Sequence, residues 1–135
     1  MSRLEGPELA ALLARKARED AVAVREFAGN PEIADGIVGF HAQQAIEKWL
    51  KAVMALRNLR EARIHDIGRL LQLLDKDGAE LPSVADQLDE LTIYAVPLRY
   101  DELLDAEPLD RDATVMLVEE VDGWATKSLD AIPGS

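Results

Sequence analysis

The stretch that decides the fold is FHAQQAIEKWLKA at residues 40–52. Its apolar residues recur at intervals of three and four, as on one side of a helix: Ala42, Ala45, Trp49 and Ala52. Extended in both directions, the pattern predicts a helix over residues 30–58, with Asn30 as its N-cap and Pro31 in its first turn. Because the apolar arc of this helix is broad, we expect it to lie centrally and to contact several neighbours.

Four further segments with helical periodicity flank this helix. They cover about residues 7–28, 66–76, 83–96 and 110–132. Asp66 and Asp110 are expected to cap the third and fifth helices, and Pro97 is expected to end the fourth. No segment has the alternation of a strand, and short loops between long helices favour antiparallel neighbours. We therefore predict an all-α fold, a single domain over residues 1–135 built as an antiparallel up-down bundle of four long helices plus one short helix.

The composition excludes several kinds of chemistry. The 135 residues include no cysteine, which rules out a disulfide framework, thiolate catalysis and a zinc–thiolate site. There is no glycine-rich phosphate loop, no H-E-x-x-H motif and no serine elbow. Neither His41 nor His65 has a glutamate three residues before it, as a di-iron helical bundle would need. We therefore expect no metal, no cofactor and no catalytic residue.

The net charge of −11 bears on the partners that the chain can bind. Phosphate backbones are bound mainly by Lys and Arg, so an acidic surface disfavours nucleic acid as a partner. No run of about 18 apolar residues is present, so we expect no membrane span. The segment Met1–Pro7 lacks the apolar stretch of a signal peptide, which makes the cytoplasm the expected location.

The first candidate site lies on the central helix. His41, Gln44 and Lys48 are spaced i, i+3 and i+7, so they project from one face of the helix. A histidine, an amide and an ammonium in a row can donate hydrogen bonds to a phosphate or a base edge. The alternative is structural: Glu47 and Lys51 pair at i, i+4, while His41 and Gln44 satisfy polar groups of neighbouring helices. The spacing leaves both interpretations open.

Two other candidate sites lie outside the central helix. His65 directly precedes Asp66, which either holds the His65 ring or caps the third helix. Arg99 and Tyr100 follow the proline that ends the fourth helix, where a guanidinium can hold a phosphate or carboxylate with two bonds. The alternative for Arg99 is a surface salt bridge with a neighbouring acidic residue.

Together these features resemble the HEPN family, the domain named for higher eukaryotes and prokaryotes nucleotide-binding. The resemblance rests on the string at 40–52, on His65-Asp66, and on Tyr94-Ala95-Val96 followed by Arg99-Tyr100, and it spans about residues 7–129. It implies a four- or five-helix bundle, a stand-alone prokaryotic protein and a homodimer. It also implies a minimal nucleotidyltransferase as partner in a two-component or toxin–antitoxin-like pair, and a nucleotide as ligand.

Many HEPN proteins are metal-independent ribonucleases with an Arg-x(4–6)-His motif that leads into a late helix. Arg60 and His65 have this spacing, but they precede the short third helix, and no histidine follows Arg99 or Arg111. The resemblance therefore implies a non-catalytic module. The expected ligand-binding residues are His41, Gln44, Lys48, His65, Arg99 and Tyr100. The alternatives are a ribonuclease toxin that acts through Arg60 and His65, and a structural protein-interaction module with an acidic docking surface.

Overall fold

The computed structural model describes residues 6–60, 63–95 and 108–130, and these ranges are helical with no strand. Three long helices are α1 (Gly6–Ala28), α2 (Asp35–Leu56) and α6 (Arg111–Asp130). Between α2 and α6 come α3 (Ile67–Lys76), the single turn α4 (Ala85–Leu88) and the 3-10 helix η1 (Asp89–Tyr94). No helix in the described ranges is long and apolar enough to cross a membrane.

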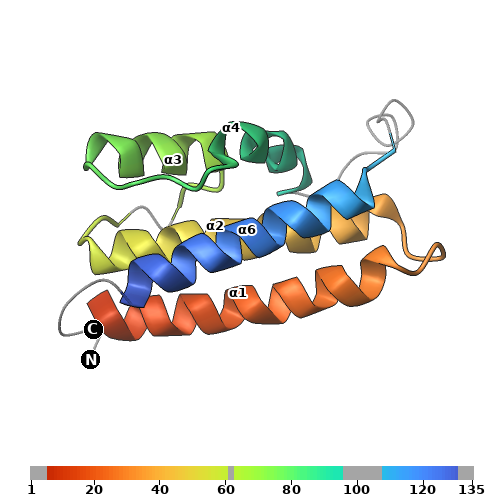
Figure 1. The fold of residues 1–135 in the computed structure, drawn as a ribbon, viewed down its shortest axis with the longest axis horizontal. Helices are drawn as coiled ribbons and strands as arrows, with labels where there is room; N and C mark the ends of the chain where they lie inside the picture. Colours follow the sequence, from red (N-terminus) through yellow and green to blue (C-terminus); the bar gives the residue numbers. More distant parts are fainter. Residues whose placement is uncertain (1–5, 61–62, 96–107, 131–135) are drawn as a thin grey trace.

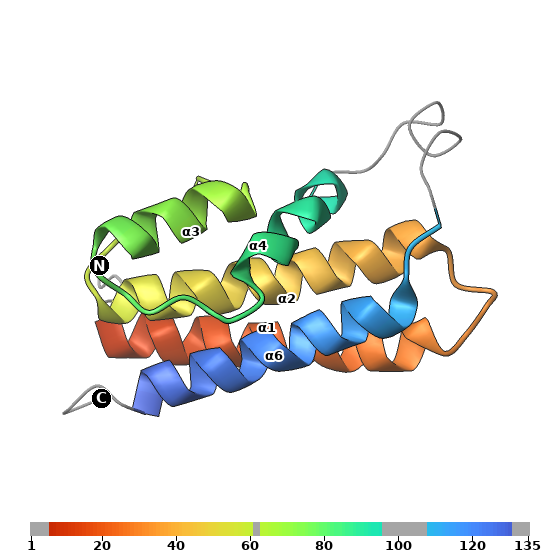
Figure 2. The same cartoon turned by 45° about the horizontal axis from the view of Figure 1, so that its top comes forward.

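The helices pack as a bundle around α2 (Figure 1). α1 runs antiparallel to α2 along its whole length, and α6 lies against both of them. α3, α4 and η1 cover another side of α2, which the turned view separates from α6 (Figure 2). α2 contacts α1, α3, η1 and α6. The predicted all-α bundle and its central helix are confirmed.

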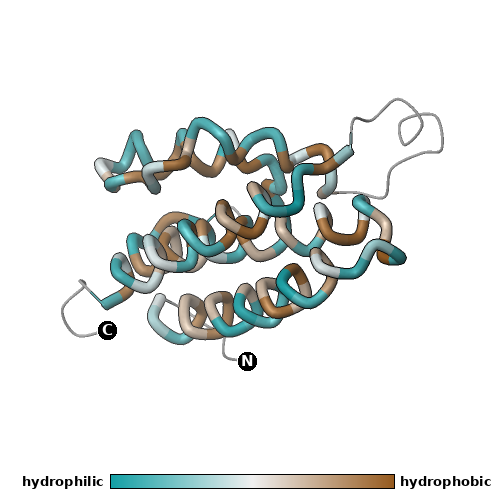
Figure 3. Tube along the Cα trace, turned by 45° about the vertical axis from the view of Figure 1, so that its right-hand side comes forward, coloured by the Kyte–Doolittle hydropathy of each residue, from teal (hydrophilic) through white to brown (hydrophobic). Residues whose placement is uncertain are grey.

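The core lies between α2 and the helices around it. Small residues on one side of α1 let its backbone approach α2 closely: Ala10, Ala14, Ala17 and Ala21. From α2, the largest fully buried side chains are Ile46, Trp49 and Leu50. Apolar positions turn inward along each helix and polar ones outward (Figure 3). Burial of these apolar faces is the main favourable contribution to folding.

The start of α2 differs from the prediction. The helix begins at Asp35, and Ala34 stands at its N-cap without a side-chain hydrogen bond. Asn30, predicted as the N-cap, instead accepts a hydrogen bond at its Oδ1 from the backbone N–H of Glu32 at 2.9 Å. This local bond closes a turn, because an Asn side chain that bonds its own backbone two residues on competes with helix formation. The prediction of Asn30 as cap is therefore wrong.

The predicted helix over 83–96 is also less regular than expected. It consists of α4 followed by η1. The side chains of η1 bond to the start of α3: Asp89 Oδ1 accepts from Gly68 N at 3.1 Å, and Thr92 Oγ1 accepts from Ile67 N at 3.2 Å. Periodicity could not reveal this, since the partners come from another helix. The caps of the neighbouring helices are confirmed: Asp66 accepts from Arg69 N in α3, and Asp110 accepts from Ala113 N in α6.

Candidate functional site

Asp20 of α1 joins two of the side chains that helical spacing placed on one face of α2. Its Oδ1 accepts a hydrogen bond from His41 Nδ1 at 2.9 Å, and its Oδ2 accepts one from Lys48 Nζ at 2.5 Å. The His41 ring meets Phe27 and Phe40 edge-on, with centroid distances of 5.7 and 5.4 Å. His41 and Lys48 thus share one carboxylate and are held in place by α1.

Gln44 lies on the same face, but its bond is within α2. Its Nε2 donates to Gln43 Oε1 at 2.7 Å. Gln43 is fully buried, and its own Nε2 donates to Glu47 Oε1 at 2.8 Å and to the backbone carbonyl of His65 at 3.3 Å. Gln44 is therefore linked to a second group of polar residues, centred on Glu47.

Glu47 is only 5 % exposed and is held by three side chains. Besides the Gln43 amide, Lys51 Nζ donates to its Oε2 at 3.1 Å, and His65 Nδ1 lies 3.1 Å from the same oxygen. Burial on its own would raise the pKa of Glu47. The hydrogen bonds from Gln43, His65 and Lys51, with the positive charge of Lys51, outweigh burial and hold that pKa below its ordinary value. Glu47 is therefore ionised at neutral pH.

Of the remaining predicted site residues, one lies in a loop, and two lie outside the part of the chain that the structure describes. His65 comes from the loop between α2 and α3, and its side chain is 61 % exposed although its Nδ1 is held by Glu47. Of the two roles predicted for Asp66, the structure shows the cap of α3. The His65 ring is held by Glu47 instead of by Asp66. Arg99 and Tyr100 lie outside the described residues.

A cavity of about 290 Å³ adjoins these polar residues, between the first half of α1 and the last half of α2. We call it the α1–α2 cavity. Its lining is mostly apolar, from Leu9 and Leu13 of α1, Met54 and Ala55 of α2 and Leu59 after it. Among the described residues, the polar part of its lining is formed by four charged side chains: Glu47, Lys48, Lys51 and Arg60. Lys48 belongs to the Asp20 group and Glu47 and Lys51 to the other, so the cavity touches both.

Arg111 has a structural role at the opposite end of the bundle. Its guanidinium donates to Asp35 Oδ1 at 2.9 Å and to the backbone carbonyls of Phe27 and Asn30 at 3.1 and 3.0 Å, and it also bonds the Ile33 carbonyl. These carbonyls belong to the end of α1 and the turn after it. Arg111 therefore ties the turn to α6, and its donors are directed at the protein's own backbone.

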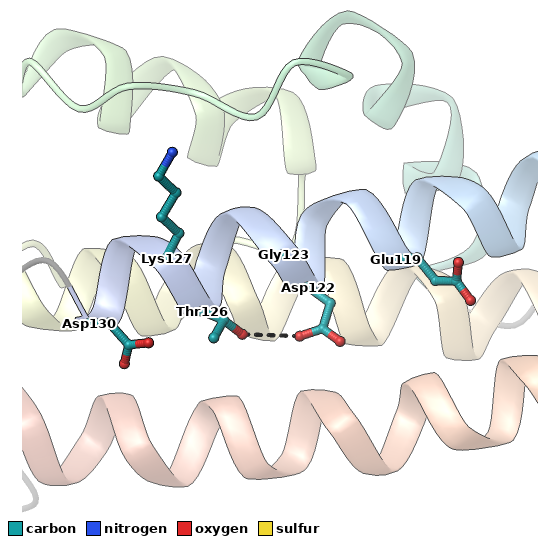
Figure 4. A pocket seen from close by; sticks show the side chains of 6 residues that line it. All are labelled: Glu119, Asp122, Gly123, Thr126, Lys127 and Asp130. Carbon is teal, nitrogen blue, oxygen red and sulfur yellow. Dashed lines mark hydrogen bonds between the residues drawn. The ribbon is translucent and has the colours of Figure 1, made fainter.

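The outer surface of α6 is acidic and shallow (Figure 4). Glu119, Asp122, Lys127 and Asp130 point outward from it, around Gly123, which has no neighbouring atom within 4 Å of where a Cβ would lie. Within α6, Thr126 Oγ1 donates a hydrogen bond to Asp122 Oδ1 at 3.2 Å. Within the described ranges no group of three or more His, Asp or Glu is arranged to hold a metal ion. This surface offers no enclosed site.

Sequence reasoning did not identify Asp20 or Gln43 as members of the site. Asp20 lies one turn from Ala17 and Val24 on the side of α1 that faces the core, and a carboxylate in such a row was a usable signal. Gln43 gave no comparable signal, because its importance comes from burial against a loop. The predicted Glu47–Lys51 pair is present, as the structural interpretation of the helix required.

A comparison with family models finds a match to the chain. The model described as HEPN domain covers residues 10–128, which is most of the chain and includes every residue of the two polar groups and all but one lining residue of the cavity. No curated protein and no solved structure matches the chain.

Proposed function

The chain belongs to the HEPN domain family, and we propose that it acts there as a non-catalytic module that binds a nucleotide. In this proposal it also forms a homodimer and partners a minimal nucleotidyltransferase in a two-component or toxin–antitoxin-like pair. The binding residues are His41, Gln44 and Lys48 on α2, with His65 from the following loop.

The observation that carries the proposal is the way in which two helices orient these donors. Asp20 fixes His41 and Lys48, whose side chains remain 28 % and 27 % exposed. Glu47 fixes the Nδ1 side of the His65 ring and leaves the rest of that ring exposed. Donors that are held in place before a ligand arrives lose little conformational entropy on binding, which favours affinity. A phosphate or a base edge is the kind of group that such donors recognise.

Ribonuclease activity through Arg60 and His65 is the competing function. A histidine whose Nδ1 is held by a carboxylate is suited to proton transfer, so the geometry of His65 gives this alternative some support. At the later position, however, Arg111 is bound to backbone carbonyls and has no histidine near it in sequence. We therefore favour binding without catalysis.

Calorimetry with ATP, GTP and a short RNA tests the proposal. We expect at least one nucleotide to bind the wild type, and we expect Lys48→Ala to weaken that binding about tenfold, as loss of one charged hydrogen bond does. Lys16→Ala is the matched control, because Lys16 is an exposed α1 lysine that pairs only locally with Glu19. If the folded wild type gives no heat of binding with any of the three ligands, nucleotide binding is removed from the proposal.

Two further measurements separate the alternatives. RNA that is cleaved by the wild type and spared by His65→Ala would replace the proposal with ribonuclease activity. Light scattering after size exclusion gives the oligomeric state, and copurification with a coexpressed minimal nucleotidyltransferase tests the partner. A strong protein partner with flat nucleotide titrations would favour the structural protein-interaction module.

A further inference from the structure

A chain of three polar side chains runs from the buried side of α2 to its exposed face. It begins at Glu47, whose carboxylate is ionised at neutral pH and therefore accepts hydrogen bonds but donates none. Gln43 Nε2 has an acceptor for each of its two hydrogens, Glu47 Oε1 at 2.8 Å and the backbone carbonyl of His65 at 3.3 Å. Since these two acceptors fix the nitrogen end of the amide, the carbonyl oxygen of Gln43 is directed the other way, toward Gln44.

The orientation of Gln43 determines the orientation of the next amide. Gln43 Oε1 accepts a hydrogen bond from Gln44 Nε2 at 2.7 Å, which places the nitrogen of Gln44 on this side. Among the described residues, nothing bonds to the Gln44 carbonyl oxygen or to the second hydrogen of its Nε2, and Gln44 is only half-buried. Gln44 thus presents an acceptor and a donor at the face of α2, and the buried charge of Glu47 decides which end of the amide is the acceptor.

An exposed aromatic ring lies one turn before Gln44. Phe40 is 38 % exposed, although phenylalanine is among the residues most often buried. Its ring meets the His41 ring edge-on with 5.4 Å between centroids, and Asp20 holds His41 in place. Phe40, Gln44 and Lys48 follow one another at intervals of four residues, which is a rise of about 6 Å each time. A stacking surface, an amide and an ammonium therefore lie in one line along α2.

We propose that this face selects a nucleotide whose base is adenine, and that Gln44 determines the selection. The base stacks on Phe40, its 6-amino group donates to Gln44 Oε1, and its N7 accepts from the second hydrogen of Gln44 Nε2. A glutamine amide fits this edge of adenine with two hydrogen bonds, whereas guanine and hypoxanthine carry a carbonyl oxygen in place of the amino group. The phosphate lies toward Lys48. This inference rests on the proposed nucleotide binding and adds the identity of the base.

AMP and IMP are the probes, because the first has an amino group and the second a carbonyl oxygen at position 6 of the purine. Binding is followed by the backbone amide shifts of ¹⁵N-labelled full-length protein. We expect the wild type to bind AMP about tenfold more tightly than IMP, a difference of the size that one bidentate pair provides. Equal affinities, or tighter binding of IMP, would overturn the inference and leave nucleotide binding intact. If neither nucleotide binds, the proposed function falls and this inference falls with it.

Substitutions assign the two contacts separately. Gln44→Met keeps the length of the side chain and removes the amide, so AMP should lose its advantage over IMP. Gln87→Met, at an exposed glutamine of α4, should leave the ratio of the two affinities unchanged. Phe40→Leu should weaken AMP and IMP alike by about tenfold through loss of stacking, whereas Phe40→Tyr should bind both as the wild type does. An AMP preference that survives Gln44→Met, or unchanged affinities in Phe40→Leu, would contradict the proposed contacts.

The orientation of the amides can be tested without a ligand. Both side-chain N–H groups of the buried Gln43 should exchange with solvent far more slowly than those of Gln87, because each has an acceptor inside the protein. Hydrogen exchange of the side-chain amides, followed by NMR, measures the difference. If the Gln43 hydrogens exchange as fast as those of Gln87, the polarity of the Gln44 amide is not fixed, and the inference fails even where AMP binds.

Discussion

Glu47 shows at the scale of one residue how a buried charge makes stability depend on pH. Its carboxylate is enclosed by Gln43, Lys51 and His65, and its pKa is held below the ordinary value. A carboxyl group with a depressed pKa in the folded state contributes stability that is complete above the unfolded-state value of about 4.3. That contribution is lost as the pH falls through the folded-state pKa.

Glu47→Gln should therefore do two things. It should lower the free energy of unfolding at pH 7 by about 3 kcal/mol, because it removes an almost fully buried carboxylate to which Gln43, Lys51 and His65 are bonded. It should also flatten the fall in stability with acid, since Gln does not titrate. Urea unfolding between pH 7 and pH 3 measures both effects. Glu19→Gln, at an exposed carboxylate paired with Lys16, should change neither by more than about 0.5 kcal/mol; equal losses from the two variants would contradict this account.

The same residues show what could be predicted about the site. The spacing of His41, Gln44 and Lys48 correctly placed them on one face of α2, because helix geometry is local and periodic. Their partners Asp20 and Glu47 depend on how α1 and the loop before α3 pack against α2, and spacing within one helix carries no such information. Arg99 and Tyr100 lie outside the described residues and stay predictions.

Contacts between elements decide which glycine positions tolerate a side chain. A Cβ on Gly39 of α2 would lie 2.6 Å from Cδ1 of the Tyr94 ring, which packs on it from η1. A ring held by its own helix cannot move aside freely. Gly123 of α6 faces open space. The two positions are both helical and differ chiefly in this contact.

Gly39→Ala and Gly123→Ala are therefore expected to have opposite effects. Gly39→Ala should destabilise the protein by about 2 kcal/mol, because overpacking against η1 exceeds the gain in helix propensity. Gly123→Ala should stabilise it by up to about 1 kcal/mol through propensity alone. Urea unfolding of both variants checks the signs, and a stabilised Gly39→Ala would show that η1 is not packed on α2 as described.

Arg111 tests the connection between α1, α2 and α6. Arg111→Lys keeps the charge near Asp35 but replaces a planar group of five donors with a single ammonium that cannot reach the same set of carbonyls. We expect a loss of about 2 kcal/mol in unfolding free energy, from backbone acceptors left without donors. Arg25→Lys is the control, since Arg25 makes only a long exposed contact with Glu119. A loss below about 0.5 kcal/mol for Arg111→Lys would mean that water replaces the guanidinium.

Helix boundaries could be predicted best where the apolar repeat extends over many residues. The boundaries of α1, α3 and α6 were close to those observed, because apolar stripes and side-chain caps act within each helix. The start of α2 was missed because Asn30 bonds the N–H of Glu32 in a turn and Arg111, 81 residues away, binds the turn's carbonyls. The segment over 83–96 was expected to be a longer helix because its apolar spacing is helical, yet Asp89 and Thr92 bond to α3 and leave η1 as a 3-10 helix.

At the scale of the whole molecule the dominant quantity is the net charge of −11. Excess charge of one sign destabilises a compact state through self-repulsion, and added salt screens that repulsion. We therefore expect the melting temperature to rise between 20 and 300 mM NaCl, concentrations chosen to span the range over which screening changes most. The local effect of any one acidic residue must be separated from this global term.

Asp130 and Asp112 provide that separation, because they lie at opposite ends of α6. Asp130→Lys and Asp112→Lys change the net charge equally, from −11 to −9, so both should reduce the salt dependence of the melting temperature to the same extent. Their local effects differ in sign. A cation in place of Asp130 (Figure 4) suits the negative end of the helix dipole and should add about 0.5 kcal/mol, whereas a cation in the first turn at Asp112 should cost a similar amount. Thermal unfolding of the wild type and both variants across the salt series separates the effect of net charge from the local effect. We expect the melting temperatures of the two variants to depend equally on salt, with one variant more stable and the other less stable by its local effect. A salt dependence that changes in only one variant would show that the salt response arises from local contacts and not from the net charge.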